Sequence, residues 1–279
     1  MTEANSNPDS KVVNLHYTDR CNYRCRFCHC RFQKTPLAMD DWRKIIDNIS
    51  SGISVRRFNL AGGEPLAGEY VQEMIDYIAA RGIDCSIITN GSLLSPDFIV
   101  RNRGKLQMIG ISVDGLDYAD NSQIGRIDHD GRELSKDRLA ELAKAVHAAG
   151  IRLKINTVVN AVNCRKDFAP LIQQLAPERW KLLRMLHYDH ANDIGLNLMV
   201  SDEEFWGFVS RHRHLHPVVE DSDDMVNSYI VVNPQGRILT NSSVRFDATE
   251  SLVNHPFREE FAKVSFCEES YQKRYQTAV

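Results

Sequence analysis

Segments with the pattern of β-strands alternate with segments that have the pattern of α-helices along most of this chain. We expect strands at 11–17, 55–61, 84–90, 105–114, 151–159 and 179–186, and helices at 40–50, 68–81, near 95–103, and at 134–149, 166–176 and 201–213. Six successive strand-then-helix units predict a parallel sheet covered by helices. Because no glycine fingerprint of a dinucleotide fold follows the first strand, we expect an α/β partial (βα)6 TIM-like barrel. In such barrels the chemistry lies at the C-terminal ends of the strands.

The pattern changes after about residue 225. The segments NSYIVVN, PQGR and ILTN predict a β-hairpin, which we interpret as a cap over the barrel mouth. We expect residues 116–132 to form a polar loop and the acidic run at 220–224 to be a solvated turn. The predicted domain division is therefore a disordered tail at 1–10, the partial barrel at 11–215, and a C-terminal extension at 216–279 that caps the active site.

Composition restricts the class of protein. The 279 residues are 43% hydrophobic and 25% charged, with a formal net charge of −3. These values are ordinary for a globular chain and give no reason to expect a nucleic acid or a membrane surface as partner. The first ten residues are polar, and no stretch approaches the ~20 apolar residues of a membrane span. We expect a cytoplasmic protein.

The cysteines are unevenly distributed. Four of the seven fall within residues 21–30, and the segment CNYRCRFC spaces Cys21, Cys25 and Cys28 as CxxxCxxC directly after the first strand. Three thiolates on one loop can each bind one iron of a four-iron, four-sulfur cluster and leave the fourth iron open. Two alternatives stay open: a zinc site completed by His29 or Cys30, and unrelated buried cysteines.

A second motif, LAGGEPL, ends the second strand. Its adjacent Gly62 and Gly63 allow close approach of the backbone to a ligand, and Glu64 can accept a hydrogen bond from an amino group. Together with the cysteine motif, this segment resembles the radical S-adenosylmethionine superfamily over about residues 12–190. The resemblance implies a 4Fe-4S cluster and S-adenosylmethionine, whose methionine moiety binds at the glycine-rich strand end. Asn90 in TNGS and Ser112 also fall where that superfamily contacts its cofactor.

A narrower resemblance covers about residues 12–241. The segments NLHYTDRCNYRCRFC, NLAGGEPL, ITNGSLL, IGRI, KINTVVN, RWKLL, SDEEF and NSYIVVN are similar, in order and spacing, to viperin and its prokaryotic relatives. This resemblance implies conversion of a ribonucleoside triphosphate, such as CTP, UTP or GTP, to its 3′-deoxy-3′,4′-didehydro form, a chain terminator in antiviral defence. It also implies an electron donor such as flavodoxin or ferredoxin. The nucleobase does not follow from the sequence.

The viperin resemblance carries over a set of substrate residues: Asn14, Arg57, Arg126, Lys154, Asn156, Lys181 and Tyr229. Lys154 and Asn156 are two apart on one strand and so project from one face. With Lys181 on the next strand and Arg126 in the loop after the fourth, three cations would converge on one mouth and suit a triphosphate. Arg126 is expected to contact S-adenosylmethionine as well. Arg57 stands where the family often has lysine, which keeps the charge and changes the geometry.

Tyr229 matches a family tyrosine close to the reacting ribose, and we expect it to be catalytic. The competing interpretations are a hairpin core residue for Tyr229 and solvated surface charges for the lysines and arginines. Two other functions also remain open: a radical enzyme acting on a peptide or another small molecule, and a non-catalytic iron–sulfur or zinc protein. We expect residues 211–216, despite their histidines, to be a solvated helix end, and Cys85 to be core. Cys30, Cys164 and Cys267 receive no role.

Overall fold

Six parallel strands form the centre of the molecule. The computed structural model describes residues 9–30, 37–187, 192–240 and 247–276. The strands are β1 (Lys11–Thr18), β2 (Val55–Gly62), β3 (Asp84–Thr89), β4 (Leu106–Ser112), β5 (Arg152–Val159) and β6 (Arg179–Arg184). They pair in sequence order and all run in the same direction. The strand-then-helix prediction is confirmed, with boundaries that differ by a few residues.

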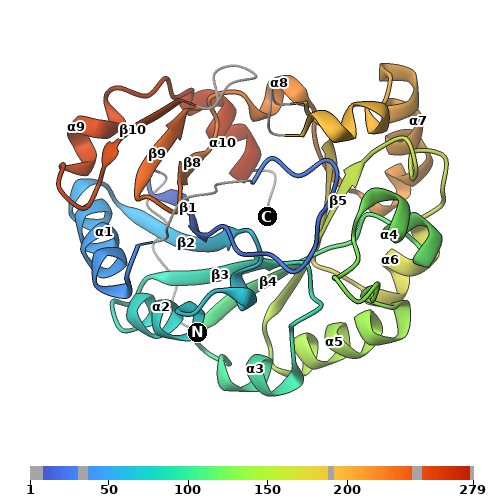
Figure 1. Ribbon diagram of the computed structural model, residues 1–279, viewed down its shortest axis with the longest axis horizontal. Coiled ribbons are helices and arrows are strands. Elements are labelled where there is room, and N and C mark those ends of the chain that lie inside the picture. Colours follow the sequence, from blue (N-terminus) through green and yellow to red (C-terminus); the bar gives the residue numbers. More distant parts are fainter. Residues whose placement is uncertain (1–8, 31–36, 188–191, 241–246, 277–279) are drawn as a thin grey trace.

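Helices cover the outer face of this sheet (Figure 1). They are α1 (Met39–Gly52), α2 (Val71–Ala79), α3 (Pro96–Arg101), α5 (Lys136–Ala148), α6 (Ala169–Leu175) and α7 (Asp202–His212), with short 3-10 turns at Pro65–Ala67, Asp193–Leu198 and Arg213–Leu215. The capping box expected at the start of α7 is present, with Ser201 and Glu204 bonding to each other's backbone. Residues of the strands that face these helices form one large apolar core.

The alternation of side chains along β1 explains how the sheet separates core from site. Val13 and Leu15 are fully buried and pack in the apolar core. Asn14, between them, points to the opposite side and lines an interior cavity. The concave face of the sheet therefore carries polar residues, whereas the convex face is apolar.

The C-terminal extension continues the sheet. The strands β7 (Val218–Glu220), β8 (Ile230–Val232), β9 (Arg237–Thr240) and β10 (Asp247–Ser251) complete the order β10-β9-β8-β1-β2-β3-β4-β5-β6-β7. The expected hairpin forms from β8 and β9, and β8 pairs in parallel with β1. The hairpin thus extends one edge of the sheet, which does not close into a full barrel in the part of the chain that the structure describes.

Two expectations about loops are wrong, and the solvated helix end expected at 211–216 holds except at His212, since Arg211, Arg213, His214 and His216 are exposed. The region 116–132 contains helix α4 (Tyr118–Ile124), capped by Asp117 and ended by Gly125 in the left-handed conformation. Its seven residues are too few to give a clear helical period. The acidic run is no solvated turn, because Glu220 ends β7 fully buried and α8 (Ser222–Met225) follows it. His212 is also buried, where its Nε2 accepts a hydrogen bond from the Phe168 amide at 2.9 Å.

Two further helices, α9 (Phe257–Phe261) and α10 (Glu268–Gln276), end the described chain. α10 joins the two sides of the sheet. The hydroxyl of Tyr271 accepts a hydrogen bond from the Val12 amide of β1 at 2.6 Å, and Arg179 of β6 donates to the Arg274 carbonyl at 3.2 Å. Because β1 and β6 are distant in the sheet order, α10 spans the interior between them.

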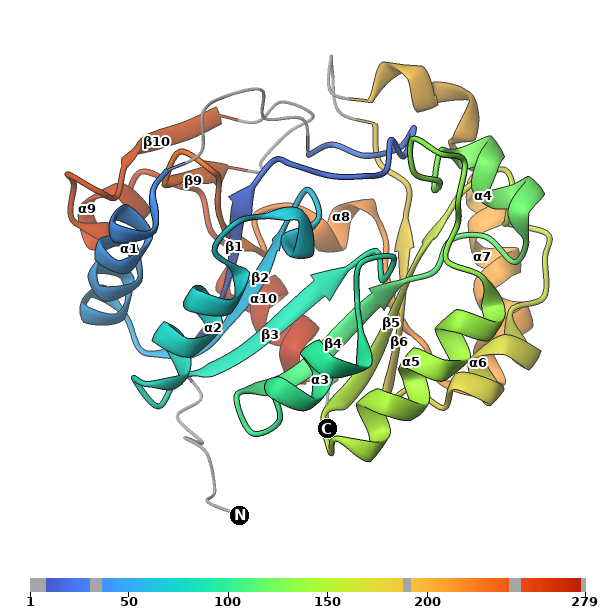
Figure 2. The same ribbon diagram turned by 60° about the horizontal axis from the view of Figure 1, so that its bottom comes forward.

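The loop after β1 crosses the carboxyl ends of the strands towards α4 (Figure 2). Two backbone hydrogen bonds fasten it there, from Arg24 to the Gly125 carbonyl at 3.2 Å and from Arg26 to the Ile124 carbonyl at 2.9 Å. A Cβ on Gly125 would lie 2.3 Å from the Arg24 carbonyl oxygen. Only glycine fits this contact at a positive φ.

Gly125→Ala should therefore destabilise the protein more than an ordinary glycine replacement. Gly104→Ala is the matched control, since Gly104 also has a positive φ but nothing within 4 Å of its Cβ position. We expect the control to cost about 1–2 kcal/mol of unfolding free energy and Gly125→Ala clearly more, measured by urea denaturation. Equal losses would show that the loop contact does not constrain this glycine.

Candidate functional site

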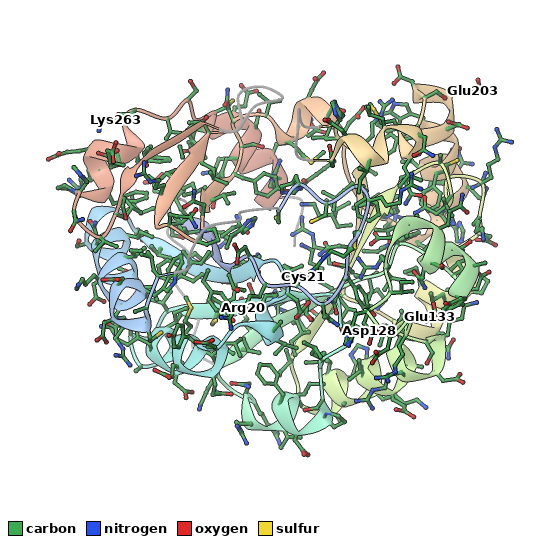
Figure 3. The ribbon with its side chains drawn as sticks, viewed as in Figure 1. Arg20, Cys21, Asp128, Glu133, Glu203 and Lys263 are labelled. Atoms are coloured by element: carbon green, nitrogen blue, oxygen red, sulfur yellow. The ribbon has the colours of Figure 1, made fainter. Side chains whose placement is uncertain are left out.

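The cysteine loop carries Cys21, Cys25 and Cys28 at the carboxyl ends of the strands, and all three are partly buried. Cys21 lies near the centre of the molecule in Figure 3. A short turn closes the loop, in which the Cys28 amide donates to the Cys25 carbonyl at 3.1 Å. Burial raises the pKa of Cys21, and it raises that of Cys25 to about 12. Binding of a metal centre would therefore have to displace the thiol protons.

The spacing of the thiols bears on the zinc alternative. Among the described residues, the one group of three potential ligand atoms within 4.8 Å of one another is Asp128, His129 and Asp130, in a surface loop. The three thiols thus do not all lie within 4.8 Å of one another, as three ligands of one zinc ion would. In a cluster each cysteine binds a different iron.

The GGEP segment holds the cysteine loop in place. The Gly63 amide donates to the Thr18 carbonyl at 2.8 Å, and the Glu64 amide donates to the Arg20 carbonyl at 2.7 Å. A Cβ on Gly62 or Gly63 would lie 2.3 Å from a carbonyl oxygen of this loop. In this structure the two glycines thus allow the strand end to approach the loop backbone, whereas we had expected a close approach to a ligand.

Glu64 is completely buried, and its carboxylate accepts hydrogen bonds from other residues of the protein. It accepts hydrogen bonds from the Thr89 hydroxyl at 2.7 Å, the Asn90 amide at 2.7 Å and the Leu66 amide at 3.0 Å. Burial raises its pKa, and these three donors oppose that effect. Glu64 therefore fixes the end of β3 against the end of β2.

Asn90 forms the next contact with the cysteine loop. Its side-chain amide donates to Asn22 Oδ1 at 2.9 Å, and Asn22 Nδ2 donates to the Ser92 hydroxyl at 2.8 Å. The TNGS segment is thus bonded to a residue between the first two cysteines. The predicted cofactor residues Gly62, Gly63, Glu64 and Asn90 all surround this loop.

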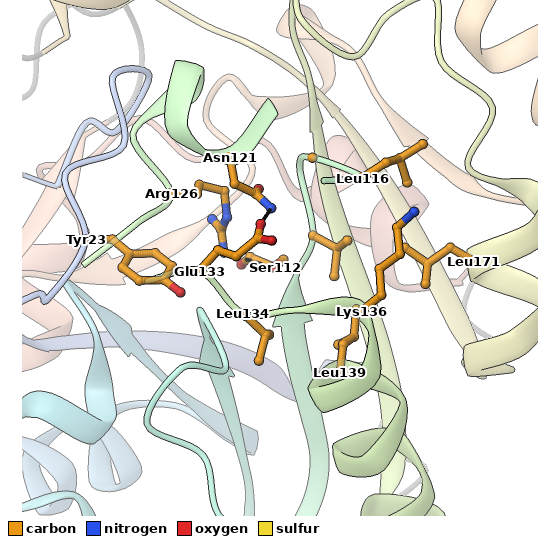
Figure 4. A pocket seen from close by; sticks show the side chains of 12 residues that line it. Tyr23, Ser112, Leu116, Asn121, Arg126, Glu133, Leu134, Lys136, Leu139 and Leu171 are labelled. Carbon is orange, nitrogen blue, oxygen red and sulfur yellow. Dashed lines mark hydrogen bonds between the residues drawn. The ribbon is translucent and has the colours of Figure 1, made fainter. Parts of the chain in front are cut away.

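Arg126 lies beside the cysteines and not with the lysines. Its Nη1 is 2.8 Å from the buried carboxylate of Asp114 and 3.9 Å from Cys25 Sγ, and its Nη2 donates to the Ser112 carbonyl at 2.8 Å. The expected convergence of Arg126, Lys154 and Lys181 on one mouth is therefore not found. Arg126 and Ser112 instead line a separate cavity of about 400 Å³ with Tyr23, Asn121 and Glu133 (Figure 4).

A second cavity, of about 420 Å³, lies on the concave face of the sheet. Five basic residues and several polar ones line it: Asn14, Arg57, Asn59, Lys154, Arg179, Lys181, Tyr229 and Arg274. Four predicted substrate residues, Asn14, Arg57, Lys154 and Lys181, and the predicted catalytic Tyr229 thus meet in one cavity. We name it the basic cavity. Asn156 is the Cα partner of Lys181 in the adjacent strand, two residues along β5 from Lys154.

Burial and charge distinguish these cations from surface lysines. Burial holds the pKa of Lys154 well below its usual value, and the neighbouring Lys181 and Arg179 add to this effect. The Oδ1 atom of Asn156 is buried with no hydrogen-bond partner among the described residues. Lys154 is thus repelled by neighbouring positive charge, and Asn156 Oδ1 lacks a hydrogen-bond donor. A bound ligand with negative charge and a hydroxyl group would remove both costs.

Lys181 and Tyr229 form one connected group with a buried carboxylate. Lys181 Nζ lies 2.5 Å from Glu220 Oε1 and donates to the Tyr229 hydroxyl at 2.6 Å. The Tyr229 hydroxyl donates in turn to Glu220 Oε2. Burial lowers the pKa of Lys181 to about 8, although Glu220 opposes this shift. Tyr229 is thus a polar group of the cavity and not only a packing residue.

Asn14 has a structural contact in addition to its place in the cavity. Its Nδ2 donates to the Ile230 carbonyl of β8 at 3.1 Å, and its Oδ1 accepts from Asn59 Nδ2 at 2.9 Å. Asn59 Oδ1 accepts from the Ser86 hydroxyl at 2.8 Å. This chain of hydrogen bonds links four strands, β8, β1, β2 and β3, and ties the C-terminal hairpin to the barrel.

Sequence reasoning missed Asn59, Arg179, Glu220 and Arg274. Arg179 and Asn59 could have been found, because each is the register partner of a predicted residue on the adjacent strand. Arg274 could not, since no periodic pattern predicts that the C-terminal helix enters the sheet interior. Glu220 was predicted to be solvated because the residues that follow it in sequence are also acidic.

Comparison with known proteins agrees with this geometry. The model of the radical SAM superfamily matches residues 15–175. An S-adenosylmethionine-dependent nucleotide dehydratase from Selenomonas ruminantium is 35% identical over 269 residues, covering 94% of this chain and 98% of the relative. One from a Thermoplasmatales archaeon is also 35% identical, over 256 residues, covering 90% and 91%. The chain therefore belongs to the radical SAM superfamily and, within it, to the viperin-like family of these relatives.

Solved structures support the fold. Streptococcus suis SuiB bound to S-adenosylmethionine superposes with a TM-score of 0.70 at 15% identity, over 96% of this chain and 68% of SuiB. The enzyme anSMEcpe with bound AdoMet and a peptide gives a TM-score of 0.69 at 13% identity, over 96% and 83%. Family membership and the cysteine geometry identify a 4Fe-4S cluster and S-adenosylmethionine as the cofactors. None of the described helices has the length and apolar character to cross a membrane.

Cys25→Ala should abolish iron loading, because three ligands are the fewest that can hold the cluster at this loop. Cys30→Ala is the control: Cys30 is on the same loop, with its Sγ 3.6 Å from His16 Nδ1, and should load iron normally. Iron content and visible absorption after anaerobic reconstitution measure both. Normal loading of the Cys25 variant would refute the assignment.

Lys154 should take up a proton when an anion enters the basic cavity, because the anion favours its charged form. Affinity for inorganic tripolyphosphate should therefore fall as pH rises through the depressed pKa of the free site. Titration calorimetry in two buffers of different ionisation enthalpy measures the uptake, and Lys154→Met should reduce it to the share that Lys181 contributes. Identical heats in the two buffers for the parent protein would contradict this assignment.

Proposed function

We propose that this protein is a radical S-adenosylmethionine nucleoside triphosphate dehydratase of the lyase type. The product would be the 3′-deoxy-3′,4′-didehydro nucleotide, a chain terminator of viral polymerases. The observation that carries the proposal is the basic cavity, in which five cations line one interior space on the face of the sheet whose strand ends hold the cysteine loop. Relatives of similar length that carry the name nucleotide dehydratase support the same class of substrate.

The charge of the cavity favours a polyphosphate. The three arginines of the cavity, Arg57, Arg179 and Arg274, stay protonated at any physiological pH. A bound anion also favours the protonated forms of Lys154 and Lys181, which can then donate charged hydrogen bonds to it. Buried cations are costly unless an anion compensates them. A peptide or a neutral small molecule, the alternative class of substrate, would leave most of this charge uncompensated.

The chemistry that the cluster and S-adenosylmethionine supply is abstraction of the ribose C4′ hydrogen by a 5′-deoxyadenosyl radical. The residues of this chain bind and orient the nucleotide so that one C–H bond meets the radical. The arginines and lysines would hold the phosphates, and Asn156 and Asn14 would contact the ribose. The Tyr229 hydroxyl, bonded to Lys181 and Glu220, would donate the proton with which the 3′-hydroxyl leaves as water. One further electron from the external reductant would complete the product.

Two partners follow from this proposal. The reaction needs one-electron reduction of the cluster, for which we propose a flavodoxin or a ferredoxin. It also needs reduced thiols at Cys21, Cys25 and Cys28 to bind the cluster. We accordingly place the enzyme in the reducing cytoplasm.

The test is an anaerobic assay of the reconstituted protein with CTP, UTP, GTP and ATP separately. We expect at least one nucleotide to give both 5′-deoxyadenosine and a product lighter than the substrate by the mass of one water, each followed by mass spectrometry. Formation of 5′-deoxyadenosine with a peptide, and with none of the nucleotides, would reject the nucleotide as substrate.

Tyr229→Phe should uncouple radical formation from product formation. The ring remains in place while the hydroxyl that donates to Glu220 is lost, so 5′-deoxyadenosine should still form and the dehydrated nucleotide should fall about tenfold or more relative to it. Tyr118→Phe, in which the exposed Tyr118 loses its hydroxyl, is the control. If the ratio stays at the parental value in both variants, Tyr229 is not the proton donor.

A further inference from the structure

Glu220 is a buried carboxylate that contacts two cations of the basic cavity, Lys181 and Arg274. It is 2% exposed. One carboxylate oxygen lies 2.5 Å from Lys181 Nζ, and the other accepts from the Tyr229 hydroxyl and lies 3.4 Å from Arg274 Nη1. Both oxygens are thus bonded to residues that line the cavity.

These contacts connect four separate parts of the chain. Lys181 lies on β6, Glu220 ends β7, Tyr229 precedes β8 and Arg274 lies on α10. The Arg274 guanidinium also stacks on the Tyr229 ring at 3.4 Å from its centroid and donates to the Ser228 hydroxyl at 2.6 Å. Without a carboxylate at position 220, two buried cations would repel each other where these elements meet.

We propose that Glu220 is the resident counter-ion of the basic cavity, a positioning residue that fixes Lys181 and Tyr229 and moderates the attraction of the cavity for polyphosphate. The inference rests on the proposed function and extends it to a residue that does not itself bind the phosphates. Its negative charge competes with the ligand for Lys181 and Arg274. Its two oxygens hold Lys181 and the Tyr229 hydroxyl in one arrangement.

The two effects of Glu220 have opposite signs for binding and for turnover. Removing the charge makes the cavity more positive, so a polyphosphate should bind more tightly. Removing the acceptor oxygen leaves the Tyr229 hydroxyl and Lys181 less well oriented, so turnover should fall. A residue needed only for folding would lower both binding and turnover.

Three variants separate the effect of the negative charge at position 220 from the effect of the side-chain length. Glu220→Gln removes the charge at nearly constant shape, and Glu220→Asp keeps the charge but shortens the side chain. Asp223→Asn removes an exposed carboxylate three residues further along and controls for net charge. Calorimetry of the reconstituted protein measures the affinity for inorganic tripolyphosphate. The anaerobic assay measures kcat and KM with whichever nucleoside triphosphate the parent converts.

We expect Glu220→Gln to bind tripolyphosphate about tenfold more tightly and to lose about tenfold or more in kcat. Glu220→Asp should lose kcat without binding more tightly, and Asp223→Asn should match the parent in both. If the Gln variant fails to fold, as judged by its thermal melting, the Asp variant decides: parental kcat there would overturn the positioning role.

Weaker tripolyphosphate binding by Glu220→Gln, or parental values of both affinity and kcat, would overturn the proposal. Equal tightening in Asp223→Asn would do so as well, because bulk charge would then explain the effect. A parent protein that binds no tripolyphosphate and converts no nucleotide would refute the proposed function and this inference together. A parent that does both, with unaffected Glu220 variants, would refute this inference alone.

Discussion

The compensation of buried positive charge is the constraint on which the concave side of this molecule depends. Isolated lysines and arginines inside a sheet would cost several kcal/mol each in desolvation. The chain reduces this cost with Glu220, whose carboxylate contacts Lys181 and lies within 3.4 Å of Arg274. Glu220 does not remove the whole cost, since burial and neighbouring positive charges still depress the pKa of Lys154. The remaining positive charge is what makes the cavity suited to an anion.

The same six strands serve two differently built regions. At their carboxyl ends, backbone contacts from GGEP and from the residues after α4 hold the cysteine loop. On their concave face, side chains two residues apart on β1, β2 and β6, together with one side chain from each of β3, β4 and β5, line the basic cavity. Asn156 relates the two, because it pairs with Ser112 on one side and with Lys181 on the other. Through Asn156, the basic cavity is thus connected to the carboxyl ends of the strands, where the cysteine loop lies.

The sequence predicted most of the fold, because each strand and helix of the barrel has its own period and its own terminal signals. It also predicted the cysteine motif. The four cations or amides of the cavity, Asn14, Arg57, Lys154 and Lys181, came from the resemblance to viperin, and strand spacing supported only the shared face of Lys154 and Asn156. The sequence did not predict α4, whose seven residues end at Gly125, or the burial of Glu220. Arg126, which the resemblance assigned both to the cofactor and to the substrate, lies beside the cysteines and not with the lysines. A loop residue has no register, and its place depends on Asp114, which lies 2.8 Å away.

This difference follows from the kind of contact in each region. The cysteine loop rests on contacts that exclude a Cβ at Gly63 and Gly125, so only one residue type is compatible and a motif results. The basic cavity needs positive charge at about the right distance, which lysine and arginine can both supply with different reach. Arg57, where the family often has lysine, is an example of that freedom. A region built on charge can therefore change its residues while it keeps its ligand class, and its members must be found from strand register rather than from a motif.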